Sequence, residues 1–335
     1  MKNRFRLALA ASALAALPAV HAQQQPAQPT SEAVRDALAK KADDTDQTSL
    51  LKETLTAVDK QYTLIKRGQT LLTYDLNYAY IGQEKINTDL SSGNATLFSI
   101  ENQNSHTFTN TLLVDYGLRD NVTASVTLPF VSRYSDSDTF NGTSNSIGDI
   151  TLGARVQPFS AQRDQASLTF TSSLRLPTGD SPFKVDPGKG LATGSGLTTL
   201  TLGMNVNKIV DPVALFGSFN VGASAPAKHL SQNIGGAKLK TVRPGSTIGF
   251  GMGFAYALSY KITTSFSFQE QISAGSRLSF DNGREAKTST QSAGILSIGA
   301  GYRMSPKTTL NVVVGIGLTA AAPNMNIDVS LPLSF

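Results

Sequence analysis

Apolar and polar residues alternate along most of this chain after Gly68, whereas before Gly68 the apolar residues recur every three or four positions. The change falls within residues 60–80, KQYTLIKRGQTLLTYDLNYAY. A repeat of three to four residues predicts an amphipathic helix, and a repeat of two predicts a strand with one apolar face. The chain is therefore expected to pass from helix to strand across Lys66-Arg67-Gly68-Gln69, with almost no linker.

The predicted helix covers residues 47–68. Its apolar seam consists of Leu51, Leu55, Val58, Tyr62 and Ile65. Lys66 and Arg67 suit the last turn of a helix, and Gly68 suits its end. Because an isolated helix of this length is marginal in water, we expect it to pack against the part of the chain that follows, as a plug or gate.

Twelve alternating segments follow the helix. They lie near residues 69–82, 105–117, 121–131, 147–158, 166–177, 195–207, 213–223, 245–257, 261–273, 290–303, 307–319 and 324–335. Long and short connections alternate between them, which is typical of antiparallel hairpins in a closed barrel with tight turns at one end.

A soluble β-sandwich also alternates apolar and polar residues, so the alternation alone does not separate the two folds. Aromatic residues next to the short turns favour a barrel, because they predict a girdle at the periplasmic interface. These residues are Tyr116, Phe159, Tyr256, Tyr260, Tyr302 and Phe335. The sequence therefore predicts an all-β, transmembrane, antiparallel up-and-down barrel of twelve strands over residues 69–335. Its apolar side chains should face lipid, and its Thr, Ser, Asn and Gly residues should face the lumen.

The N-terminus has the organisation of a secretory signal peptide over residues 1–22. Lys2, Arg4 and Arg6 precede an apolar run, and Val20-His21-Ala22 forms a small-x-small cleavage site. A short transmembrane anchor is the alternative, but Pro18 interrupts a run shorter than the ~20 residues a span requires. Residues 23–46 are predicted to be a flexible periplasmic leader with a short helix. The expected location is the bacterial outer membrane, with the N-terminal segment in the periplasm or inside the barrel.

Composition adds two constraints. Only 16% of the 335 residues are charged and Cys is absent, which suits an exported protein that does not depend on disulfides. Cleavage of the signal peptide lowers the formal net charge from +5 to +2. The basicity of the full chain is therefore no argument for binding nucleic acid, and no nucleic-acid partner is predicted.

Several lumen-facing positions carry charge or lack a side chain. The predicted lumen-lining set is Arg155, Arg175, Gly249, Gly251, Gly253, Arg303 and Asp328. Strand direction places Asp75, Asp115, Arg155 and Arg303 near the periplasmic mouth, Arg175 near the outer rim and Asp328 nearer the middle. The glycines would either make room for something in the lumen or only assist curvature, and both interpretations remain open.

The charges near the mouth have two interpretations. They pair with one another and stiffen the wall, or they form a latch in which Lys60, Lys66 and Arg67 bind Asp75 and Asp115. In the second case the helix is held in or under the lumen, with Gly68 as its hinge.

No constellation for catalysis is present. The chain after the signal peptide has two histidines, His106 and His229. Ser105 adjoins His106, but neighbouring residues of a strand point to opposite faces and cannot act as nucleophile and base. No metal-ligand spacing and no cofactor motif is found, so neither a metal site, a cofactor nor an enzymatic activity is predicted.

Four motifs occur in order along the barrel. They are Leu128-Pro129-Phe130, Gly148-Asp149-Ile150, residues 176–180 (LPTGD) and Gly194-Ser195-Gly196. This ordered set resembles the outer-membrane barrel family associated with meta-pathway phenol degradation, over roughly residues 69–335. The stretch from Leu64 through Gly68 to Tyr80 is similar to the start of the Fap functional-amyloid secretion channel, a relative of that family. This second resemblance implies a trimeric twelve-strand barrel with an N-terminal helical plug and a coiled coil before it.

The sequence thus predicts an outer-membrane channel gated by its N-terminal helix. The main hypothesis is translocation of a secreted polypeptide of the functional-amyloid type. The alternative is an uptake or diffusion channel for small aromatic or hydrophobic solutes, and a third class is a structural or adhesive barrel. Expected partners are outer-membrane lipid, the transported polypeptide or solute, further copies in a homotrimer, and the barrel-assembly machinery, with Phe335 as the C-terminal assembly signal.

Overall fold

The computed structural model describes residues 64–88, 98–137, 141–159, 165–185, 190–210, 212–230, 232–234, 237–305 and 308–333. The strands are Thr70–Thr88 (β1), Phe98–Arg119 (β2), Val122–Ser137 (β3), Asn141–Ile147 (β4), Thr151–Val156 (β5), Ser167–Arg175 (β6), Thr199–Val210 (β7), Val213–Ser224 (β8), Ala227–Lys228 (β9), Asn233–Ile234 (β10), Ala237–Arg243 (β11), Thr247–Ala257 (β12), Ile262–Ser273 (β13), Arg277–Phe280 (β14), Glu285–Lys287 (β15), Gln291–Arg303 (β16), Thr309–Gly317 (β17) and Met325–Leu333 (β18). Among the described residues, no helix is long and apolar enough to cross a membrane.

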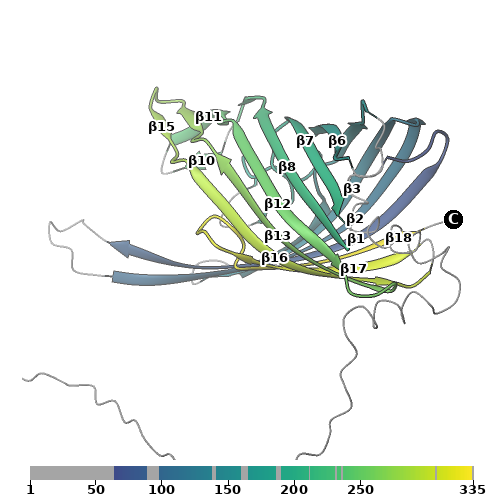
Figure 1. Ribbon diagram of the computed structural model, residues 1–335. Coiled ribbons are helices and arrows are strands. Elements are labelled where there is room, and N and C mark those ends of the chain that lie inside the picture. The colour runs from purple at the N-terminus through teal and green to yellow at the C-terminus, as the bar shows by residue number, and fades with distance from the viewer. Residues whose placement is uncertain are drawn as a thin grey trace, which may run out of the picture. The chain divides into compact units, whose positions relative to one another are not determined.

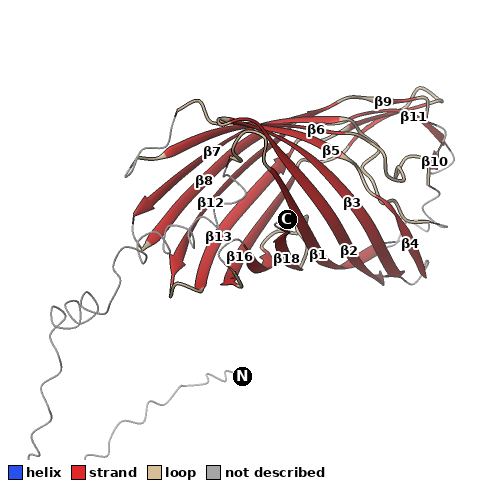
Figure 2. Cartoon of the chain, turned by 90° about the vertical axis from the view of Figure 1, so that its right-hand side faces the viewer, coloured by secondary structure: helices blue, strands red, loops and turns tan. Residues whose placement is uncertain are grey.

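The main sheet closes on itself. The first strand pairs with the last, with Leu72 opposite Leu333 and Tyr80 opposite Met325. The ring runs β1, β2, β3, β5, β6, β7, β8, β12, β13, β16, β17, β18 and returns to β1, with every neighbouring pair antiparallel. Figures 1 and 2 show these tilted strands from two sides. The predicted twelve-strand antiparallel barrel is confirmed, and closure leaves no unpaired strand edge in the membrane.

One wall position is shared by two strands, β4 and β5, both of which pair with β3. Ile147 of β4 lies opposite Phe130, and Thr151 of β5 lies opposite Thr127. Between these two positions the β4–β5 segment therefore contains one residue more than β3. Such a bulge interrupts pairing and reverses the alternation of side chains. The prediction that strand 4 begins near residue 147 was therefore wrong, because the strand already starts at Asn141 and Gly148-Asp149-Ile150 divides it.

The first hairpin is longer than predicted. Pairing between β1 and β2 continues to Thr88 and Phe98, whereas β18 accompanies β1 only to Tyr80 and β3 accompanies β2 only to Gln103. The hairpin consequently projects past its neighbours (Figure 1). The alternation of apolar residues used for the prediction weakens after Tyr80, so the sequence placed the strand end too early.

The two faces of the wall differ as predicted. On β7 the apolar Leu200, Leu202, Met204 and Val206 are exposed on the outside, while the residues between them are shielded. The most buried polar side chains are hydroxyls on the inner side, and they include Thr123, Thr169 and Thr263. An apolar exterior with a polar interior is the arrangement of a barrel that faces lipid.

Aromatic side chains mark both ends of the lipid-facing surface. Five residues of the predicted periplasmic girdle are exposed next to the short turns: Tyr116, Phe159, Tyr256, Tyr260 and Tyr302. The sixth, Phe335, lies outside the described residues, and its role as an assembly signal stays a prediction. A second aromatic group, not predicted from the sequence, lies on β1, β2 and β3, where His106 contacts Tyr78, Tyr80 and Tyr134. The Nδ1 atom of His106 also lies 2.9 Å from the hydroxyl of Tyr78.

Five short strands, β9, β10, β11, β14 and β15, extend the wall beyond the extracellular rim, where the sequence predicted loops. β11 leads into β12, β14 follows β13, and β15 leads toward β16. β11 pairs with β9 and β14, and β14 pairs with β15 (Figure 1). Leu239 is fully buried and Val242 almost so, which gives this extension a small apolar core of its own.

Candidate functional site

The chain enters the lumen side of the barrel immediately before the first strand. Gly68 has a φ of 76°, a left-handed conformation that glycine adopts readily. Its amide donates to the carbonyl of Gly117, and the amide of Gly117 donates to Gln69. One residue before Lys66, the amide of Ile65 donates to Oγ1 of Thr123, 3.1 Å away. Since Thr123 is fully buried on the inner face, the chain at Ile65 lies against the inside of the periplasmic mouth.

Gly117 makes this entry possible. A Cβ atom at this position would lie 2.2 Å from the carbonyl oxygen of Lys66. No side chain fits such a distance, so the glycine allows residues 65–68 to contact the end of β2 directly.

Most of the predicted plug lies outside the described residues. This applies to Leu51, Leu55, Val58 and Tyr62 of the seam and to Lys60 of the latch. Ile65, the last residue of the seam, is half-buried. Residues 64–66 are not helical and Arg67-Gly68 form a turn, so the predicted helix does not extend to Gly68. Its remainder lies outside the described residues and stays a prediction, as does the hinge at Gly68.

The predicted latch has the wrong partner at Asp115. This carboxylate is 2% exposed, and its Oδ1 lies 2.6 Å from Nη2 of Arg155. Lys66 and Arg67 are exposed, and the backbone amide of Arg67 donates to Asp120 instead. The reason lies in the sheet: β3 separates β2 from β5, and its small Ser125, opposite both Asp115 and Gly153, lets the two long side chains meet across it. The alternative interpretation, mutual pairing within the wall, is the one found.

A second group of polar side chains lies on the adjacent part of the wall, where β1 meets β18. Asp75 interacts with Asp328, and the amide of Asn77 donates to Asp328 over 3.4 Å. Arg303 is buried at the end of β16, and its Nε donates to the carbonyl of Ser305. Arg175 is exposed toward the outer rim. The described residues contain no group of three or more His, Asp or Glu that could hold a metal ion.

The glycine-rich inner wall of β12 is covered by side chains from β8. Gly249 and Gly251 are buried, and a Cβ atom at Gly249, Gly251 or Gly253 would meet Asn220, Ser218 or Phe216, respectively. Phe216 lies closest, with its Cζ 2.4 Å from the position that a Cβ of Gly253 would take. The glycines therefore make room for the neighbouring strand's own side chains to lie flat.

Phe216 was not singled out from the sequence. Among the described residues of the twelve barrel strands, it is the one aromatic side chain on a lumen-facing position of the alternation, between the exposed Leu215 and the exposed Phe219. Its placement at an inward position of β8 was the available indication.

Asp149, in the bulge between β4 and β5, anchors the segment that joins β6 to β7. Its carboxylate accepts hydrogen bonds from the amide of Gly179 at 3.2 Å, the amide of Ser195 at 2.7 Å and the hydroxyl of Ser195 at 2.5 Å. Arg133 reaches the same segment from β3, with Nη1 3.4 Å from the carbonyl of Ala192. Three of the motifs used for the family resemblance thus contact one another here, through Asp149.

We expect Asp149→Ala to loosen this segment, because two amides and a hydroxyl lose their acceptor. One unsatisfied buried donor costs about 1–3 kcal/mol, which corresponds to about a tenfold or greater rise in local opening. Trypsin cleavage after Lys184 in the folded protein measures it. Asp180→Ala is the matched control, since among the described residues that carboxylate accepts only from Thr193, at 3.4 Å. Equal cleavage of the two variants would contradict the anchoring role.

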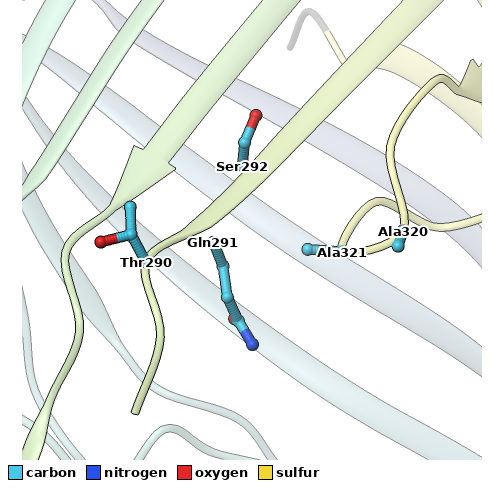
Figure 3. A pocket seen from close by; sticks show the side chains of 5 residues that line it. All are labelled: Thr290, Gln291, Ser292, Ala320 and Ala321. Atoms are coloured by element: carbon cyan, nitrogen blue, oxygen red, sulfur yellow. The ribbon is translucent and has the colours of Figure 1, made fainter. Parts of the chain in front are cut away.

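A cavity lies at the extracellular rim, between the start of β16 and the loop from β17 to β18. It has a volume of about 410 Å³ and is lined by Thr290, Gln291, Ser292, Ala320 and Ala321 (Figure 3). Its lining mixes hydroxyl, amide and methyl groups.

Comparisons with known proteins agree with this architecture. The profile of a family described as MetA-pathway of phenol degradation matches residues 93–331. Among solved structures, an outer membrane channel from Pseudomonas putida F1 superposes with a TM-score of 0.61 at 16% identity, over 82% of this chain and 98% of that chain.

Two further barrels superpose less closely. The translocator domain of the autotransporter NalP from Neisseria meningitidis has a TM-score of 0.46 at 13% identity, over 86% of this chain and 96% of that one. The TodX monoaromatic hydrocarbon channel has a TM-score of 0.46 at 11% identity, over 81% and 91%.

Proposed function

This chain belongs to the family of the MetA-pathway of phenol degradation, and from this premise we propose that it is a passive outer-membrane channel for small aromatic solutes. The observation that carries the proposal is the lumen itself. A closed ring of twelve strands is intermediate between the filled eight-stranded barrels and the wide 16–18-stranded porins. Its inner wall is lined mainly by hydroxyl, amide and glycine positions, and Phe216 adds one aromatic face.

The comparisons favour the second of the two functions predicted from the sequence. The matched family is described by a pathway of phenol degradation, and phenol is a small aromatic solute. The resemblance to the Fap secretion channel, and with it export of an amyloid subunit, the homotrimer and the contact with the assembly machinery, has no support beyond the sequence motifs.

We further propose that the segment before Gly68 restricts the periplasmic mouth. The contacts of Ile65 with Thr123 and of Lys66 with Gly117 support this direction of entry. The predicted helix, ending before Leu64, would then lie in or under the lumen, with Gly68 as the hinge.

Liposomes that contain the full chain test the solute class. We expect phenyl glucoside to enter faster than methyl glucoside, because an aromatic ring gains by stacking on Phe216, and a long dextran to be excluded. Phe216→Ala should lower the phenyl-to-methyl ratio about threefold, as aromatic pairs contribute about 0.5–1.5 kcal/mol. Phe219→Ala on the lipid-facing side of the same strand is the control and should leave the ratio unchanged. Entry of dextran, or of neither glucoside, would contradict the proposal.

A further inference from the structure

Three basic residues lie directly opposite one another on the wall extension. Arg243 of β11 pairs with Arg277 of β14, and Arg277 pairs with Lys287 of β15. All three side chains are exposed. We call Arg243, Arg277 and Lys287 the cationic row.

Such a row is unfavourable unless an anion compensates it. Side chains directly opposite in an antiparallel pair are about 4.5–5.5 Å apart at Cβ, and like charges there repel. The described residues show no ion pair between any member of the row and a carboxylate. The next pairs along the same face hold Lys228, which adds a fourth cation, and Glu285, which is the one carboxylate and accepts from the hydroxyl of Ser279. This excess of positive charge contrasts with the near-neutral balance of the chain as a whole.

The register aligns the cationic row with three lumen-facing positions at the ends of the barrel strands. Thr247, Ser273 and Gln291 pair with one another at the extracellular ends of β12, β13 and β16. Arg243, Arg277 and Lys287 each lie four residues beyond one of these positions, past a short irregular stretch of chain. Because the step is the same on all three strands, the residues that face each other remain aligned across that stretch. An even step along a strand stays on one face. The amide of Ala274 donates to Ser246 and that of Thr288 to Ser276, so pairing continues through the irregular residues between the barrel and the row. On this basis we assign the row to the face that Thr247 presents to the lumen. The rim cavity begins at Thr290, three residues after Lys287 (Figure 3).

We propose that the cationic row is a binding site for the carboxylate of the transported solute, at the extracellular mouth of the channel. This inference rests on the proposed function and narrows its solute to small aromatic acids. Arg and Lys donate charge-assisted hydrogen bonds to carboxylates, and a cluster of one sign at a channel mouth raises the local concentration of the opposite ion. The exposed Arg175 lies further in, toward the outer rim of the barrel.

Two probes of the same shape isolate the carboxylate. Phenyl glucuronide differs from phenyl glucoside by a carboxylate in place of a hydroxymethyl group. In liposomes containing the full chain at low salt, we expect the glucuronide to enter faster. The triple variant Arg243→Gln, Arg277→Gln, Lys287→Gln should lower the glucuronide-to-glucoside ratio about tenfold, at the lower end of measured electrostatic steering. In 1 M salt, where the Debye length is about 3 Å, the two proteins should give the same ratio.

The matched control removes three exposed cations near the periplasmic turns, with Arg119→Gln, Lys208→Gln and Lys261→Gln, and should retain the wild-type ratio. An unchanged glucuronide-to-glucoside ratio in the triple variant would overturn the inference. If the ratio is unchanged and the variant also loses bound lipopolysaccharide, the cationic row binds lipid phosphates instead of the solute. Glucoside entry separates the two proposals: if it fails in the wild-type protein, the proposed function is wrong, whatever the ratio.

Discussion

Deletion of residues 23–67 is expected to raise the single-channel conductance several-fold. The chain before Gly68 already contacts the inner face of the mouth at Thr123. An α-helix with its side chains is about 10–12 Å across, so one helix would fill most of the lumen of a twelve-strand barrel. Removing it should convert a restricted pore into an open one. Planar-bilayer recordings of the refolded protein measure the change directly.

Deletion of residues 23–46 is the matched control, because it removes the predicted leader and keeps the predicted helix. This shorter deletion should leave the conductance unchanged.

A point variant tests the same contact without deletion. Gly117→Ala should displace the Lys66 carbonyl and raise the frequency of opening, whereas Gly217→Ala, where the nearest atom to the new methyl is 3.8 Å away, should not. A conductance that is the same with and without residues 23–67 would exclude the gate.

The alternation of apolar residues was sufficient to predict the barrel because it reports a local property. Along β7, for example, every second residue from Leu200 to Val206 faces outward, and each of these residues is apolar in the sequence. Strand number and the girdle at Tyr116 and Tyr302 follow from the same pattern. These features need no knowledge of which strand lies beside which.

Features that depend on neighbouring strands were left open or were missed. Asp115 and Arg155 meet across β3, so their pairing requires the register of two ladders. The glycines of β12 are explained by Phe216 on β8, a residue of another strand. The bulge at Asp149 adds one residue without changing the composition of the segment. The wall extension consists of strands of two to seven residues, which are too short for an alternation to be distinguished from a loop.

Arg155→Gln is expected to produce the largest loss of stability of any single lumen substitution discussed. It leaves the Asp115 carboxylate, 2% exposed, without its ion-pair partner. Breaking a buried ion pair by removing one partner costs about 3–5 kcal/mol, because the remaining charge is desolvated and uncompensated. Urea unfolding of the refolded protein in lipid, followed by the shift in electrophoretic mobility between folded and unfolded barrel, measures the difference.

The double variant Asp115→Asn, Arg155→Gln distinguishes pairing from packing. If the cost in the single variant comes from the unpaired charge, the double variant should regain most of the lost stability, since replacement of both members of a buried pair is often close to neutral. Arg175→Gln removes an exposed lumen arginine instead and should change stability by less than about 0.5 kcal/mol. A double variant as unstable as Arg155→Gln alone would show that the side-chain volume of Arg155, rather than its charge, holds this part of the wall.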